Sequence, residues 1–218
     1  MEEELDRGCN PYIVTILLCV INILIYIYSI FFMDDAYLSG GINYDMVLHQ
    51  KEYYRFLTSI YLHADISHIA MNMLALVVAG TLVESYLGSL KMAIIYFVSG
   101  FCGSLLSLMF QNPEENVYSI GASGAIFGVL MAAALIQNKK EGKSFLRAVV
   151  FVIIYAVGTW SQGIDLLGHI GGALGGAVAG GAACIHFQDD YKEKRIKTVF
   201  GGAITVIISA AACSFILI

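Results

Sequence analysis

Residues 166–187 read LLGHIGGALGGAVAGGAACIHF, an uncharged run long enough to cross the hydrocarbon core of a membrane as one helix. Glycines recur along it at four-residue spacing, at Gly168, Gly172, Gly176 and Gly180. Such stripes of small residues let the backbones of membrane helices approach closely. His169 stands three residues before Gly172 and therefore near the same face. The stretch predicts a closely packed transmembrane helix with an imidazole near its start.

The whole chain has the composition of a membrane protein. Of its 218 residues, 58% are hydrophobic and only 13% are charged, and the mean hydropathy is +0.75; soluble domains have about 25% charged residues. Uncharged runs of sufficient length predict seven transmembrane helices, at 11–33, 63–86, 90–110, 120–138, 145–162, 166–187 and 198–218. The fold class is therefore an all-α polytopic membrane protein. The first run lacks a signal-peptidase cleavage site, so we expect it to remain as a span.

The positive charges are distributed unequally between the connecting segments. With seven alternating spans, ten of the twelve Lys and Arg residues fall on one side, and only Lys51 and Arg55 fall on the other. Because Lys and Arg mark the cytoplasmic side, residues 1–10 and the basic loop 188–197 should be cytoplasmic and the C-terminus should be outside. The segment 34–62 is too long for a simple connection and is rich in tyrosine, which predicts an interfacial outer loop.

A few polar side chains fall inside the predicted spans, where they are functional candidates because burying them in hydrocarbon is costly. His68 and Asn72 lie one turn apart on one face of the second span. Ser123 lies at the start of the fourth span, and His169 lies at the start of the sixth. All three spans enter from the outer side in the predicted orientation. These side chains should therefore lie at a similar shallow depth.

Small residues at four-residue spacing predict that the fourth and sixth spans touch. Gly124, Gly128 and Ala132 form the stripe on the fourth span. If the two stripes meet, the Ser123 hydroxyl comes within hydrogen-bonding reach of the His169 imidazole, which is the arrangement of a nucleophile and its base. His68, Asn72 and the backbone N–H of Ser123 are suitable donors to the oxyanion that develops in acyl transfer.

Each feature alone has a simpler interpretation. A serine at a Gly-rich helix start is more often a packing or capping residue, and a membrane His or Asn is as often a tie between helices. Three unrelated ties at one depth on one side would be a coincidence. Asp165 is interpreted as the N-cap of the sixth span, Glu84 as a structural residue near the cytoplasmic end, and His63 as a tie between the interfacial segment and the second span.

Together these motifs resemble the rhomboid family over nearly the whole chain. The family pattern H-x-x-x-N is similar to His68 and Asn72, G-x-S-G is similar to residues 121–124, and H-x-x-G-x-x-x-G is similar to 169–176. In two places the chain departs from the family: Tyr54 precedes Arg55 where tryptophan is common, and Tyr86 follows Glu84 where arginine is frequent. The resemblance implies a six-helix rhomboid-like core over residues 11–187, followed by one C-terminal transmembrane helix at 198–218.

The same resemblance implies roles for individual residues. Ser123 corresponds to the nucleophile and His169 to the general base. The predicted oxyanion and substrate-binding residues are His68, Asn72 and Gly121, and the supporting residues are Phe127, Gly172 and Gly176.

The function expected from this reading is an intramembrane serine endopeptidase of a bacterial plasma membrane, cutting transmembrane helices of protein substrates near the outer face. Its partners are those helices and membrane lipid. No cofactor or metal is expected, because there is no H-E-x-x-H motif, and the net charge of −5 without a basic face argues against nucleic acid. The alternatives are a proteolytically inactive rhomboid-like protein that binds membrane clients, and a small transporter, which would place its polar groups near the midplane.

Overall fold

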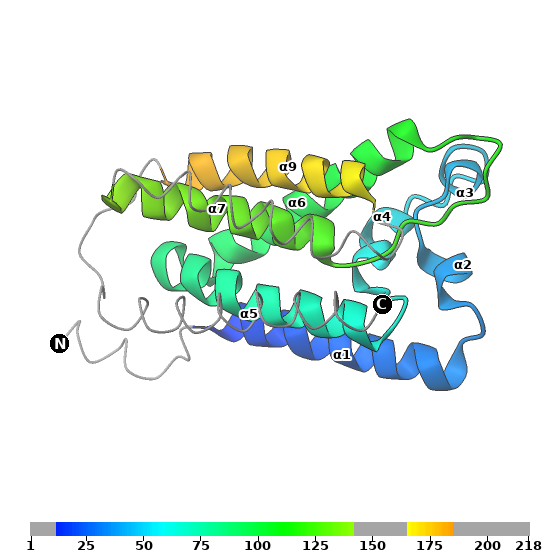
Figure 1. Cartoon of the computed structure of the whole chain (residues 1–218), viewed down its shortest axis with the longest axis horizontal. Helices are drawn as coiled ribbons and strands as arrows, with labels where there is room; N and C mark the ends of the chain where they lie inside the picture. Colours follow the sequence, from blue (N-terminus) through cyan, green and yellow to red (C-terminus); the bar gives the residue numbers. More distant parts are fainter. Residues whose placement is uncertain (1–11, 142–164, 185–218) are drawn as a thin grey trace, which may run out of the picture.

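The computed structural model describes residues 12–141 and 165–184, and this part of the chain is built from helices joined by short loops (Figure 1). Five long helices form the bundle: α1 (Ile13–Phe32), α5 (Ile66–Leu87), α6 (Ser89–Phe110), α7 (Ser123–Glu141) and α9 (Leu166–Cys184). Between α1 and α5 lie the short helices α2 (Ala36–Gly40), α3 (Tyr44–Leu48), α4 (Arg55–Thr58) and η2 (Ser59–Tyr61). The predicted spans 145–162 and 198–218, the N-terminal segment 1–10 and the loop 188–197 lie outside the described residues.

Four of the described helices, α1, α5, α6 and α9, are long and apolar enough to cross a membrane, while the apolar part of α7 is shorter, at Ser123–Gln137. The predicted all-α polytopic membrane fold is confirmed. Two helix starts differ from the prediction. The second span begins at Ile66 rather than at 63, because Asp65 caps it by accepting hydrogen bonds from the His68 N–H (2.8 Å) and the Ser67 hydroxyl (2.6 Å). The fourth span begins at Ser123 rather than at 120.

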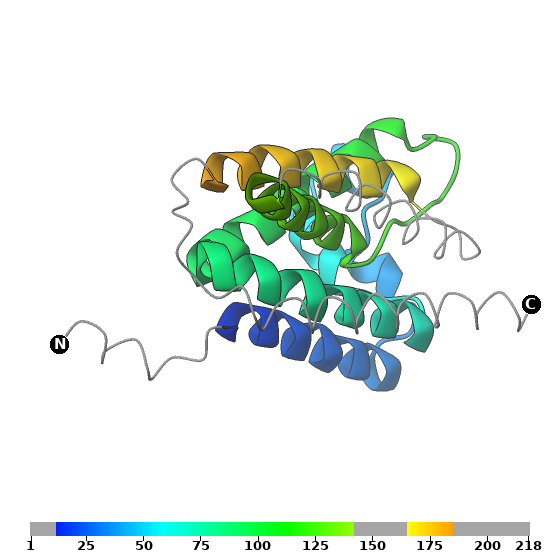
Figure 2. The same ribbon diagram turned by 60° about the vertical axis from the view of Figure 1, so that its left-hand side comes forward.

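Helix α9 packs against both α6 and α7 (Figure 2), and its glycines make both contacts possible. On one side, a Cβ at Gly172 would overlap the carbonyl of Gly124, and a Cβ at Gly176 would overlap that of Gly128. On the other side, a Cβ at Gly171 would approach the Cys102 carbonyl to 2.5 Å. The sequence predicted the first contact, and the structure adds α6 as a second partner of α9.

Glu84 ties the start of α1 to the turn between α5 and α6. Its buried carboxylate accepts hydrogen bonds from the N–H groups of Val14 and Thr15 (2.8 Å each) and from the hydroxyls of Thr15 and Ser89 (2.7 Å each). A carboxylate at a helix N-terminus satisfies N–H groups that have no partner within the helix and interacts favourably with the helix dipole. The interpretation of Glu84 as a structural residue is confirmed.

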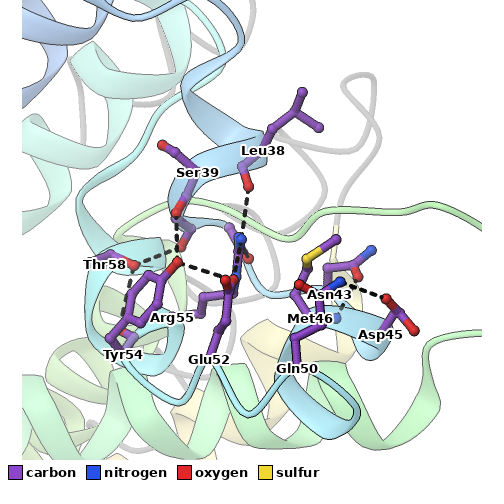
Figure 3. Close-up of polar contacts among 12 residues, drawn as sticks. Leu38, Ser39, Asn43, Asp45, Met46, Gln50, Glu52, Tyr54, Arg55 and Thr58 are labelled. Atoms are coloured by element: carbon purple, nitrogen blue, oxygen red, sulfur yellow. Dashed lines mark hydrogen bonds and ion pairs between the residues drawn. The ribbon is translucent and has the colours of Figure 1, made fainter.

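Arg55 organises the connection between α1 and α5, where α2–α4 lie (Figure 3). Its guanidinium, 3% exposed, donates to the carbonyls of Gly41 and Leu38 (2.9 Å each) and, through Nε, to Glu52 (2.7 Å). This hydrogen bond lowers the pKa of the Glu52 carboxyl below its ordinary value. Tyr54 is exposed, so in the Tyr54-Arg55 pair the arginine makes the buried contacts.

Candidate active site

The N-terminal ends of α5, α7 and α9 lie at the same end of the bundle, next to α4 (Figure 1). His68 is the third residue of α5, Ser123 the first of α7, and His169 the fourth of α9. The described part of the chain therefore brings the three predicted side chains to one level, one turn or less inside their helices.

The segment before α7 sets the position of Ser123. Residues Ile42 and Ser119 exchange two backbone hydrogen bonds of 2.9 Å, and the N–H of Gly121 donates to the Ser59 carbonyl at 2.9 Å. Gly121 has φ +127°, a conformation that other residues adopt only with strain, and a Cβ there would lie 2.9 Å from Cε1 and Nε2 of His68. A glycine is therefore needed at 121 both for the turn into α7 and for the close approach of His68.

Ser123 and His169 are hydrogen-bonded, with Oγ 2.8 Å from Nε2. For the hydroxyl to donate to Nε2, the imidazole must carry its proton on Nδ1. Nδ1 is buried and has no hydrogen-bond partner among the described residues. Phe127, one turn after the serine, stacks on the imidazole with ring centroids 4.2 Å apart and an interplanar angle of 21°. Within residues 12–141 and 165–184 the arrangement is therefore a serine and histidine pair without an acidic third member.

Asp165, the nearest acidic residue in sequence, has another contact. Its Oδ1 accepts the N–H of Gly168 at 2.8 Å at the start of α9. The interpretation of Asp165 as an N-cap is confirmed.

Two of the three candidate oxyanion donors, His68 and the N–H of Ser123, lie next to Gly121. The Nδ1 of His68 faces the N–H of Ala64 at 3.4 Å, so Nε2 carries the proton, and this is the edge of the ring that lies against Gly121. The backbone N–H of Ser123, at the first position of α7, is one of those without a partner within the helix. Asn72, 1% exposed, lies one turn further along the same face of α5 as His68.

A cavity with about 340 Å³ of empty space, counted to its open mouth, adjoins Ser123 and His169. Its lining includes Asp165, the hydroxyl residues Ser59, Ser104 and Ser119, and several glycines. The Ser59 and Ser104 hydroxyls are 3.3 Å apart. These three hydroxyls were not predicted: Ser104 is a serine in an otherwise apolar run, and Ser59 and Ser119 fall in segments between the predicted spans. In the described residues, no three His, Cys, Asp or Glu side chains meet in a way that could hold a metal ion.

The sequence model of the Rhomboid domain matches residues 50–186. The chain belongs to the rhomboid family. It is 33% identical over 169 residues to RHOMBOID-like protein 7 of Arabidopsis thaliana, with 74% of this chain and 53% of the relative covered. It is 39% identical over 154 residues to rhomboid protease GluP of Bacillus subtilis, with 68% and 29% covered. It is also 32% identical over 142 residues to inactive RHOMBOID-like protein 8 of Arabidopsis thaliana, with 62% and 39% covered.

This rhomboid is an integral membrane protein, since family membership and the apolar helices agree. The chain spans about half or less of the length of these curated relatives. One relative is named a protease and another is named inactive. The rhomboid family therefore includes both active and inactive members, and the geometry of Ser123 and His169 is the feature of this chain that bears on its activity.

Proposed function

We propose that this rhomboid is a serine endopeptidase that cleaves transmembrane helices of membrane proteins, with Ser123 as nucleophile and His169 as general base. The observation that supports it best is the 2.8 Å hydrogen bond between the two side chains, in a site where the imidazole is 6% exposed and stacked on Phe127. A hydroxyl held by an unprotonated imidazole nitrogen is ready to lose its proton as it attacks a carbonyl.

The proposed reaction follows from the positions of these groups. His169 Nε2 takes the Ser123 proton while Oγ attacks the substrate carbonyl, and the oxyanion receives hydrogen bonds from His68 Nε2, Asn72 and the Ser123 N–H. The imidazolium then protonates the leaving amine and an acyl-enzyme forms. Water enters through the hydroxyl-lined cavity and attacks the acyl carbonyl while His169 takes its proton. The imidazolium then returns the proton to Oγ as the C–Oγ bond breaks, which releases the acid and regenerates Ser123.

The substrate must expose a peptide carbonyl that a membrane helix normally keeps in a hydrogen bond. Substrate helices weakened by Gly or Pro at the level of the proposed site are therefore preferred. From the charge distribution we propose that the end of the bundle with this site faces outward, with the N-terminus in the cytoplasm, the C-terminus outside and the protein in a bacterial plasma membrane. The proposed chemistry needs no cofactor.

The second candidate is a proteolytically inactive rhomboid-like protein that binds membrane clients, which the similarity to inactive RHOMBOID-like protein 8 brings into consideration. The hydrogen-bonded serine and histidine favour the protease, because binding a client has no need of a nucleophile paired with a base.

The test is labelling of the detergent-solubilised protein with a fluorophosphonate probe, together with cleavage of a transmembrane substrate in proteoliposomes. We expect a label on Ser123 and loss of both activities in Ser123→Ala, with a decrease of at least about 10³-fold in His169→Ala. The matched control is Ser85→Ala, whose hydroxyl donates to the Leu82 carbonyl (2.8 Å) at the far end of α5. Cleavage that persists in Ser123→Ala, or a folded wild-type protein that neither labels nor cleaves, would refute the proposal.

A further inference from the structure

An aromatic chain leads from helix α1 to the candidate oxyanion donor. Tyr26 on α1 meets His63 edge to face, with centroids 6.5 Å apart and an interplanar angle of 90°. His63 in turn meets His68, with centroids 5.0 Å apart and an angle of 67°. Tyr26 is 9% exposed and His63 is 7% exposed. The three rings therefore form a series in which buried His63 touches both neighbours, buried Tyr26 and half-buried His68.

Packing alone does not explain a histidine at 63. Its Nε2 is buried without a hydrogen-bond partner in the described part of the chain, and burying such an atom is unfavourable. A phenylalanine would fill similar space without this cost. The polar contact that only the histidine makes is a long one, between Nδ1 and the Tyr61 carbonyl at 3.3 Å, and it favours the orientation of the ring that His68 contacts.

The imidazole of His68 needs this support because its own hydrogen bond is weak. The Ala64 N–H lies 3.4 Å from Nδ1, beyond the usual range for such bonds. This contact selects the tautomer with the proton on Nε2, but it constrains the ring poorly. An oxyanion donor contributes only if it is aligned before the charge develops. The contact with His63 supplies the missing constraint.

We infer that Tyr26 and His63 are positioning residues that hold the His68 imidazole in its donor orientation, so that α1 contributes to turnover through ring contacts. Helix α1 lies outside residues 50–186, the part that matches the Rhomboid domain. The inference rests on the proposed protease function and assigns to α1 a part in it.

The experiment measures kcat and KM for cleavage of a transmembrane substrate in proteoliposomes. Tyr26→Leu, which removes the ring, should lower kcat about tenfold with KM nearly unchanged, because the oxyanion forms only in the transition state. Tyr26→Phe, which keeps the ring, should restore most of the turnover. The control is Leu18→Ala, another buried change on α1, because Leu18 lies in the apolar core and makes none of these ring contacts. It should lower thermal stability without lowering kcat in the folded protein.

A double-mutant cycle separates positioning from general loosening. If Tyr26 acts through His68, then Tyr26→Leu has no further effect on kcat in a His68→Ala background. Equal and additive losses in both backgrounds, a change in KM alone, or a kcat loss in Leu18→Ala as large as that in Tyr26→Leu would overturn the inference. Fluorophosphonate labelling of wild-type Ser123 distinguishes failure of this inference from failure of the proposed function. If wild-type Ser123 is not labelled, both the protease function and this inference are refuted. If Ser123 is labelled, only the role of α1 is refuted.

Discussion

Replacing Gly172 by alanine should separate Ser123 from His169, the proposed nucleophile and base. A Cβ at this position would overlap the carbonyl of Gly124 on α7, a backbone atom that cannot rotate away. The two helices must part by on the order of 1 Å before the methyl group reaches an ordinary contact distance. Ser123 and His169 sit on these same helices and are 2.8 Å apart, so the same displacement takes them beyond hydrogen-bonding range.

The expected magnitudes follow from that displacement. Overpacking should lower the free energy of unfolding by about 1–3 kcal/mol, and a misplacement of 1 Å in the reacting groups should slow fluorophosphonate labelling of Ser123 by about 10²-fold. Labelling rates are measured on protein that elutes as a monodisperse species, and stability is measured by thermal unfolding in the same detergent.

The same helix offers graded controls. A Cβ at Gly181 has no described atom within 4 Å, so Gly181→Ala should label at the wild-type rate. A Cβ at Gly175 would meet the Cys102 side chain at 2.9 Å, so the labelling rate of Gly175→Ala should lie between those of Gly172→Ala and Gly181→Ala. If Gly172→Ala folds and labels as fast as Gly181→Ala, glycine packing does not set the distance between serine and histidine.

Three further predictions concern other contacts. Glu84→Gln turns an acceptor into a donor that faces other donors, so it should destabilise the protein by about 1–3 kcal/mol in thermal unfolding, while the fraction that stays folded labels normally at Ser123. Asp165→Asn keeps the N-cap and should preserve both stability and labelling, whereas Asp165→Ala should cost about 1 kcal/mol; slow labelling in the Asn variant would indicate a third catalytic member. Arg55 lowers the pKa of Glu52, so the unfolded state binds more protons than the folded state at acid pH. The stability from this pair is therefore present above the ordinary pKa of 4.5 and is lost as the pH falls below that value. The pH dependence of the melting temperature should be flatter in Glu52→Gln than in the wild type.

The spans themselves could be predicted from the sequence. The described bounds of α1 and α6 agree with the predicted runs within two residues, and α9 begins at the predicted residue, because hydrophobic length is a local property that the bilayer imposes. The approach of α7 to α9 was also predictable, since stripes of small residues record where backbones touch. The same rule did not reveal α6 as the second partner of α9. Gly171 and Gly175 make that contact, and they were not distinguishable from their neighbours in a run with so many glycines.

The start of α7 was less predictable because apolar residues continue into the preceding loop. The start of α5 was marked by Asp65, an N-cap residue that the predicted run had included. The bonds that hold the start of α7 come from Ile42 and Ser59, far away in the sequence and in a segment whose fold depends on Arg55. Periodicity carries no information about such a partner. The Tyr26 and His63 contact was missed for the same reason, since Tyr26 has no signal apart from its place on an apolar helix.

The hydrogen bond between Ser123 and His169 therefore depends on two separate constraints. The glycine stripes set the lateral distance between α7 and α9, while the pairing of Ser119 with Ile42, together with the turn at Gly121, sets the position at which α7 begins. An error of one residue in that start would rotate Ser123 by about 100° around the helix, away from His169, even with the helices at their correct distance. The proposed catalytic pair thus needs both the stripe of glycines and the connection between α1 and α5. The 34–62 segment supports the pair in this way, although none of its side chains forms a hydrogen bond with the His169 imidazole among the described residues.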